Sequence, residues 1–166
     1  HIPLSRVKDH LNKKLIEFKI REVFKSLFND FGIKRPKVAV LSIDPHVGDQ
    51  GVIGNDDQNL LKPVLDKLKA ESCDVKGPFA SDSFFGSKSY KNFDAIVATY
   101  HDQGLIPFKT LTFGKGVNFT AGLDIVRTSP DHGTAYDISG KNIANCDSFK
   151  SAIFTSIEIV KNREKN

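Results

Sequence analysis

The spacing of apolar residues predicts three amphipathic helices. Over residues 12–31, apolar side chains recur at steps of three and four and form one stripe, with Asn12 as the N-cap and Gly32 at the C-cap position. Similar stripes predict helices over residues 56–72 and 147–161. The residues expected to face the core are Ile16, Ile20, Val23, Phe24, Leu27, Phe28 and Phe31 in the first helix, and Phe149, Ile153, Ile157 and Val160 in the last.

Two nearly continuous apolar runs, at residues 37–43 and 93–100, predict strands that are covered on both faces. The weaker signals are short strands at 74–78, 116–120 and 124–127, helical turns within 81–92 and at 105–111, and polar loops at 44–55 and 129–145. Strands that alternate with helices predict one α/β domain over residues 1–166, layered α/β/α around a mostly parallel sheet. In such folds ligands bind at the carboxyl ends of the strands.

Composition and charge indicate which binding partners and which cellular setting to expect. The net charge is +4, but no basic run is interleaved with aromatic residues, so nucleic acid is not expected as a partner. No apolar run approaches the roughly 18 residues of a membrane span, and the first residues do not resemble a signal peptide. The two cysteines form no metal-type pair, which favours a reduced, cytoplasmic setting. The chain contains no methionine, so we expect it to be a piece of a longer protein.

Histidines follow both apolar strands. His46 lies in DPHVGD after the first strand and His101 in YHDQG after the second, so both are expected at the same edge of the sheet. His1 precedes the first helix and could fold back to that edge. Three histidines with nearby carboxylates suffice for a divalent metal site. Their separations match no local metal motif, so ordinary loop histidines remain the alternative.

A second group of residues could bind an oxyanion. Lys109, Asn118 and Arg127 lie close together in the sequence, among glycines that allow a close backbone approach. Such side chains supply donors to a phosphate. The chain has neither a GxxxxGK[ST] motif nor a GxGxxG after a strand. Surface cations on a β-ribbon are the competing interpretation.

Several stretches, in the same order, resemble the 4-hydroxythreonine-4-phosphate dehydrogenase family of vitamin B6 biosynthesis. They are HIPL, KVAVLSIDPHVGD, VKGPFASDSFF, DAIVATYHDQGLIPFK, FGKGVNFTAGLDIVRTSPDHGTAYDISGK and the last helix, which together cover residues 1 to about 159. The chain resembles the C-terminal half of that family. HGTAYDISGKNIAN is also similar to the adenosine-binding loop of the isocitrate/isopropylmalate dehydrogenase superfamily, which implies the same fold.

The resemblance implies roles for ten residues and a homodimer whose active site is shared between subunits. The implied metal ligands are His1, His46 and His101; the substrate contacts are Lys109, Asn118 and Arg127; the cofactor loop holds His132, Gly133, Asp137 and Asn145. The cofactor would be NAD or NADP, with one divalent metal per site, zinc, cobalt or magnesium. The family's N-terminal portion, which builds most of a second domain, is absent from this chain.

The implied reaction is oxidation of 4-phosphohydroxy-L-threonine to a 3-oxo acid, which decarboxylates to 3-amino-2-oxopropyl phosphate. The metal would act as a Lewis acid on the substrate hydroxyl. Asp102 and Asp82 are the candidate catalytic bases, and Asp102 could instead orient His101. The family usually has Asn where this chain has Asp44, which would add a carboxylate beside the metal.

Two other functions remain open on the sequence. The first is a paralogous dehydrogenase that acts on another phosphorylated hydroxy acid, because the same cations would bind any phosphate. The second is a metal- or phosphate-binding fragment without catalytic activity of its own.

Overall fold

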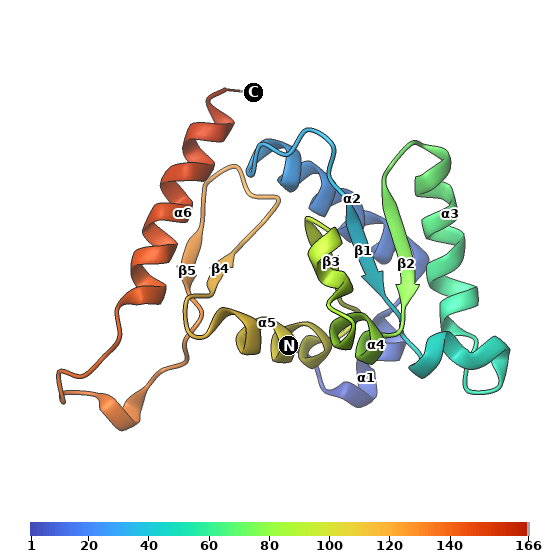
Figure 1. Ribbon diagram of the computed structural model, residues 1–166, viewed down its shortest axis with the longest axis horizontal. Helices are drawn as coiled ribbons and strands as arrows, with labels where there is room; N and C mark the ends of the chain where they lie inside the picture. Colours follow the sequence, from blue (N-terminus) through green and yellow to red (C-terminus); the bar gives the residue numbers. More distant parts are fainter. Residues whose placement is uncertain (166) are drawn as a thin grey trace.

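A computed structural model describes residues 1–165 and contains a parallel sheet (Figure 1). Strand β1 (Val38–Leu41) is central and pairs in parallel with β2 (Val75–Phe79) on one side and β3 (Ala95–Val97) on the other. The expected α/β class with a parallel sheet is confirmed. The apolar run at 93–100 yields a shorter strand than expected, and its side chains are only partly buried.

The two faces of the sheet are covered by different elements. Val38 and Val40 pack into a core with α2 (Lys13–Asn29) and α3 (Lys62–Ala70). The alternate residues, Ala39 and Leu41, pack on the other face against Phe84 of α4 (Ser81–Gly86) and a group of aromatic rings. Successive side chains of a strand point to opposite faces, so an apolar residue at every position of β1 indicates a strand covered on both. This is the layered arrangement that the sequence predicts.

Helix α2 follows its predicted pattern except at its end. The Asn12 side chain caps it by accepting a hydrogen bond from Leu15 N at 2.9 Å, as expected. Ile16, Ile20 and Leu27 are buried. Phe28 and Phe31 were predicted to face the core, but both are exposed, and Phe31 packs edge-on against Phe119. We call this part of the molecule, from α2 to β3, the sheet unit.

The remaining elements differ in detail from the sequence pattern. Helix α1 (Leu4–His10) was not expected, and the helix predicted at 105–111 is longer, α5 (His101–Thr112). The predicted helix at 56–72 consists of a π-helical turn (Asp57–Leu61) followed by α3. Short 3₁₀ segments occur at Ser89–Asn92 and Tyr136–Ile138, whereas Pro45–Gly51 is a turn whose central residues have left-handed backbone angles. Within residues 1–165, no helix combines the length and the apolar character that crossing a membrane requires.

A smaller unit lies beyond α5, which leads into it from the sheet unit (Figure 1). Strand β4 (Val117–Phe119) pairs antiparallel with β5 (Thr128–Pro130), and α6 (Asp147–Arg163) packs on this pair, which we call the ribbon unit. The strand predicted at 124–127 is wrong, because those residues belong to the loop that joins β4 to β5.

The predicted inner face of α6 is also wrong. Phe149, Ile153, Ile157 and Val160 are exposed, whereas Ser148, Ala152 and Ile159 are buried. A ribbon of two strands offers a narrow surface, and α6 contacts it at Ser148, whose hydroxyl donates to the Gly116 carbonyl oxygen, and at Ala152, whose carbonyl oxygen accepts from Thr128 Oγ1. The periodicity of the sequence correctly indicates an apolar face but not which neighbour covers it.

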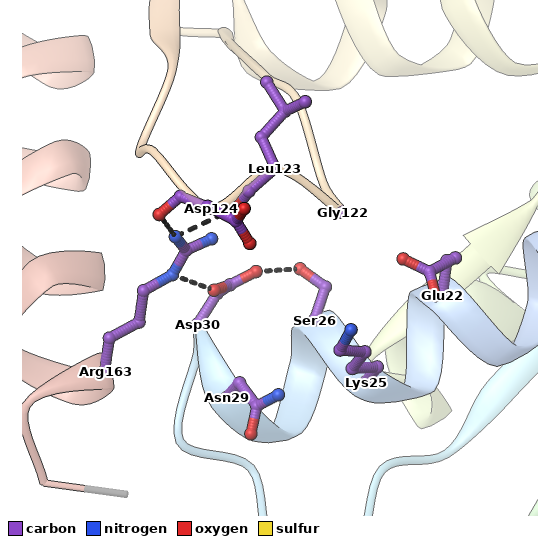
Figure 2. Close-up of a pocket in the computed structure, with 9 residues that line it drawn as sticks. All are labelled: Glu22, Lys25, Ser26, Asn29, Asp30, Gly122, Leu123, Asp124 and Arg163. Carbon is purple, nitrogen blue, oxygen red and sulfur yellow. Dashed lines mark hydrogen bonds and ion pairs between the residues drawn. The ribbon is translucent and has the colours of Figure 1, made fainter.

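A buried ion pair ties the two units together (Figure 2). Asp30, just after α2, accepts hydrogen bonds from Arg163 Nε at 2.6 Å and from Ser26 Oγ at 2.5 Å. Arg163 Nη1 also donates to the carbonyl oxygens of Leu123 and Asp124, at 3.1 and 2.9 Å, in the β4–β5 loop. This contact holds the loop and the end of α6 against the sheet unit.

Candidate active site

Three adjoining cavities form a groove at the carboxyl ends of the three parallel strands. Their volumes are about 570, 310 and 300 Å³, and Tyr100, which follows β3, lines all of them. Asp82 and Asp102 each line two of the three. The groove therefore lies where ligands bind in folds with parallel sheets. We call it the strand-end groove.

His1 and His101 meet in the 310 Å³ cavity. Their ring centroids are 4.8 Å apart, with 59° between the ring planes. His101 is the first residue of α5, and its Nδ1 lies 2.6 Å from Asp102 Oδ1. When Nδ1 carries the proton it donates to this carboxylate, which fixes the ring and leaves Nε2 free to accept a proton or bind a metal. The geometry thus gives Asp102 an orienting contact with His101.

His46 lies in the neighbouring 300 Å³ cavity with Asp82 and Tyr100. It is held by a left-handed turn in which the five residues 46–50 have φ between 44° and 77°. Four of them are not glycine, and such residues rarely adopt this conformation. Strained backbone of this kind persists only where its surroundings hold it, and it is frequent at functional sites.

Asp82 is poised as an anion beside His46. The Ser83 amide donates to Asp82 Oδ1 at 2.7 Å, and this hydrogen bond holds the pKa of the carboxyl below its usual range, with a smaller contribution from His46. Asp82 is exposed, so water shares these interactions. Its carboxylate is ionised at neutral pH and borders both the 570 and the 300 Å³ cavities.

The His46 loop is anchored by a buried carboxylate that the sequence pattern did not single out. Asp57 is fully buried, and its two oxygens accept hydrogen bonds from the amides of Ile43 and Asp44, both at 2.9 Å. Burial raises its pKa, although the two amide hydrogen bonds oppose that shift. A possible signal in the sequence was an Asp opening a helix after a glycine-rich loop.

Asp44 was expected to add a carboxylate beside a metal, but its side chain is hydrogen-bonded to the backbone at the end of the His46 loop. Its Oδ2 accepts a hydrogen bond from Asp56 N at 2.9 Å. A Cβ added at Gly54 would lie only 2.4 Å from the same oxygen. Asp44 also lines the cavity of His46, so it borders the groove while its carboxylate holds the loop closed.

Two of the three predicted metal ligands come together, and the third lies in the next cavity. Within residues 1–165, no group of three or more His, Cys, Asp or Glu side chains is arranged to hold a metal ion. The donors of one chain therefore fit a divalent metal only in part, as a pair of imidazoles from His1 and His101.

Part of the predicted cofactor loop lines a separate cavity of about 370 Å³. Lys109, His132 and Asn145 all border it. Lys109 Nζ lies 3.4 Å from the Asp131 carbonyl oxygen and 3.9 Å from its carboxylate, and Asn145 Oδ1 accepts from Asp147 N at 2.7 Å at the start of α6. Gly133 and Asp137, the other predicted cofactor contacts, do not line this cavity.

The predicted phosphate-binding residues are divided between two places. Lys109 lies in the cavity with His132, whereas Asn118 and Arg127 are exposed on the ribbon unit. Arg127 Nη1 donates to Thr120 Oγ1 at 2.9 Å across the base of the β4–β5 loop. The three side chains do not line a common cavity.

Comparison with known proteins identifies relatives for almost the whole chain. The family model of the pyridoxal phosphate biosynthetic protein PdxA matches residues 1–156. The 4-hydroxythreonine-4-phosphate dehydrogenase of Bacteroides thetaiotaomicron is 47% identical over 99% of this chain and 45% of its own length. The protein of the same name from Prosthecochloris aestuarii is 45% identical over 98% of this chain and 48% of its own. The chain thus spans about half the length of the curated relatives it matches.

Solved structures give the same fold. The crystal structure of 4-hydroxythreonine-4-phosphate dehydrogenase from Klebsiella pneumoniae matches with a TM-score of 0.80 and 37% identity, over 98% of this chain and 48% of that one. A terephthalate 1,2-cis-dihydrodiol dehydrogenase from Burkholderia xenovorans matches with a TM-score of 0.75 and 29% identity, over 94% of this chain and 50% of that one. The resemblance seen in the sequence is confirmed.

Proposed function

Because the chain belongs to the family of the pyridoxal phosphate biosynthetic protein PdxA, we propose that the whole protein is an NAD-dependent 4-hydroxythreonine-4-phosphate dehydrogenase. It would oxidise 4-phosphohydroxy-L-threonine to the 3-oxo acid, which decarboxylates to 3-amino-2-oxopropyl phosphate in vitamin B6 biosynthesis. The observation that carries this proposal is the match of nearly the entire chain to relatives of that name. The strand-end groove, with its paired histidines and carboxylates, supports it.

The two candidate bases differ in their contacts, which supports different roles for them. Asp102 is paired with His101 at 2.6 Å, so we assign it to orienting that ring. Asp82 is hydrogen-bonded to Ser83 and not to an imidazole, is ionised at neutral pH and borders the largest cavity of the groove. We therefore assign the acceptance of the substrate hydroxyl proton to Asp82. Its low pKa means that it would hold this proton only transiently.

The proposed metal ligands are His1, His46 and His101, with zinc, cobalt or magnesium as the ion. One chain offers only a pair of these imidazoles in one cavity, so we propose that a second subunit completes the ligand set. The surface that this homodimer would bury is the mostly apolar 570 Å³ cavity of the groove. Ile106 and Leu111 line it and are exposed, and it continues directly to Asp82 and Asp102.

The cofactor and the phosphate are assigned to the ribbon side of the molecule. We propose that NAD, or NADP, binds in the loop that carries His132, Gly133, Asp137 and Asn145. The cavity shared by His132, Asn145 and Lys109 supports this position. Lys109, Asn118 and Arg127 are the proposed contacts of the substrate phosphate, as cationic and amide donors.

A second function is favoured by one structural neighbour. The Burkholderia xenovorans protein, whose name specifies terephthalate 1,2-cis-dihydrodiol, shares this fold at 29% identity. The same scaffold therefore occurs in a dehydrogenase named for a substrate without a phosphate. The alternative is that the whole protein oxidises the secondary hydroxyl of another acid.

The test is NADH formation by the whole protein with 4-phosphohydroxythreonine, in the presence and absence of EDTA. We expect metal-dependent turnover that His101→Ala abolishes and His10→Ala, a change at an exposed histidine of α1, leaves unchanged. Turnover of a cis-dihydrodiol acid but not of the phosphorylated substrate would establish the alternative. Equal loss of activity in both histidine variants would remove the special role of His101.

A further inference from the structure

A buried glutamine joins the three loops that carry the polar residues of the strand-end groove. Gln103 is 8% exposed and lies in the first turn of α5. Its Nε2 donates to the Ser42 carbonyl oxygen at 2.7 Å and to Ser81 Oγ at 2.8 Å. Its Oε1 accepts from Thr99 N at 2.7 Å and from Thr99 Oγ1 at 3.0 Å. Both hydrogens and both lone pairs of the amide are thereby used.

The three partners come from three different strand ends. Ser42 directly follows β1, Ser81 opens α4 after β2, and Thr99 follows β3. Each loop then presents one of the groove's candidate residues a few positions along the chain. The groove residue is His46 in the first loop, Asp82 in the second and His101 in the third. One side chain therefore sets the spacing of all three loops.

Only a carboxamide of this length satisfies these partners together. The Ser42 carbonyl requires a donor and the Thr99 amide requires an acceptor, and Gln103 meets both needs from a single planar group. A glutamate carboxylate has no hydrogen for Ser42 and would place a charge against its carbonyl oxygen. A leucine would remove the hydrogen-bond partner of the buried Ser42 and of the half-buried Ser81 and Thr99.

We propose that Gln103 is a positioning residue that holds His46, Asp82 and His101 in register. It acts through the loops, because its own amide is occupied by their backbone and hydroxyl groups. The assignment rests on the proposed function, since it gives those three residues their purpose. It adds a residue that neither the metal, the phosphate nor the cofactor assignment includes.

The experiment compares Gln103→Leu and Gln103→Glu in the whole protein with Ser26→Ala, which removes a buried hydrogen bond far from the groove. Amide hydrogen exchange should accelerate on the order of tenfold in all three loops of the Gln103 variants, and not in Ser26→Ala. Titration with Co²⁺, followed by its visible absorption, should show affinity about 10–100-fold lower in the Gln103 variants alone. kcat should fall more than KM rises.

The outcomes separate the two proposals. Exchange that stays at the wild-type rate, or that accelerates in one loop only, overturns the joining role of Gln103. Loosened loops with Co²⁺ affinity and kcat equal to those of Ser26→Ala would make Gln103 purely structural and overturn the positioning role. If the wild-type protein neither binds Co²⁺ nor turns over substrate, the proposed function is wrong. Hydrogen exchange then still tests whether Gln103 holds the three loops together.

Discussion

Replacing Arg163 by methionine should destabilise the protein strongly, because it leaves a buried carboxylate without its cation. Asp30 is 3% exposed, and after the change only Ser26 Oγ would remain of its two side-chain donors (Figure 2). Removing one partner of a buried ion pair typically costs about 3–5 kcal/mol. The Arg163 side chain is 24% exposed, so water reaches it and we expect the lower end of that range.

Urea unfolding of Arg163→Met measures this cost, and Arg21→Met is the matched control. Arg21 makes two ion pairs, with Glu17 at 2.8 Å and Glu71 at 2.6 Å, but its side chain is 41% exposed. Water and salt screen exposed pairs, so the control should lose far less stability. A loss of about 3 kcal/mol corresponds to a fall in Tm of about 6–12 °C for a chain of this size.

Two results would refute the reasoning. The first is a loss of stability in Arg163→Met no larger than in Arg21→Met. The second concerns the double variant Asp30→Asn/Arg163→Met, in which no buried charge is left unpaired. Its loss should be smaller than the sum of the single losses, and simple additivity would show that the two side chains are not coupled.

Three further changes probe the groove and the ribbon. Asp57→Asn should cost about 1–3 kcal/mol, because it replaces one of the two accepting oxygens by an NH₂ group, which cannot accept from Ile43 N or Asp44 N. Burial raises the folded-state pKa of Asp57, so its stabilising contribution is complete below the unfolded pKa and falls as pH rises through the folded pKa. Urea unfolding should therefore show a larger cost near pH 4 than near pH 7, and the opposite trend would mean that its hydrogen bonds outweigh burial. Gly54→Ala should lower stability by about 1–3 kcal/mol, since its Cβ would lie 2.4 Å from Asp44 Oδ2. Thermal melts of this variant and of Gly86→Ala test the prediction, because Gly86 has open space around it and its replacement should be nearly neutral. Arg127→Ala should raise KM for the phosphorylated substrate with little change in kcat, and an equal effect of Lys115→Ala in the same kinetics would count against a phosphate contact.

The elements that the sequence predicts well are those whose signal is local. The N-cap of α2 depends on Asn12 and a residue three positions away, and the burial of β1 on both faces follows from an unbroken apolar run. The position of polar residues at strand ends also follows from the chain, because His46, Asp82 and Tyr100 each lie a few residues beyond a strand. Local patterns were therefore enough to indicate the fold class and the edge of the sheet that carries the groove.

The misplaced elements depend on contacts that local patterns do not encode. The spacing of apolar residues in α6 is helical, as predicted, but Ala152 and Ile159 are buried whereas Phe149 and Ile153 are exposed. Residues 124–127, predicted as a strand, belong to the β4–β5 loop, whose backbone is hydrogen-bonded by Arg163, some 40 residues away in the sequence. Neither result can be obtained from periodicity, which describes one element at a time.

The groove itself depends on buried polar side chains whose purpose appears only in three dimensions. Gln103 and Asp57 have ordinary polar neighbours in the sequence, yet each is buried and satisfies backbone groups at the end of β1. Burying a polar group is costly unless every partner is placed for it, so such residues constrain a loop more tightly than apolar packing does. The left-handed turn at His46 requires that constraint.

The division of the candidate residues between the two units gives the Asp30–Arg163 contact a consequence beyond stability. The histidines and Asp82 belong to the strand-end groove, whereas Asn118 and Arg127 belong to the ribbon unit. A substrate that reaches both must span units joined by α5 and by the Asp30–Arg163 ion pair. The relative placement of the two sets therefore depends on contacts that touch neither, among them Asp30–Arg163 and the ring contact of Phe31 with Phe119. A contact that fixes this placement would reduce the ordering that substrate binding requires.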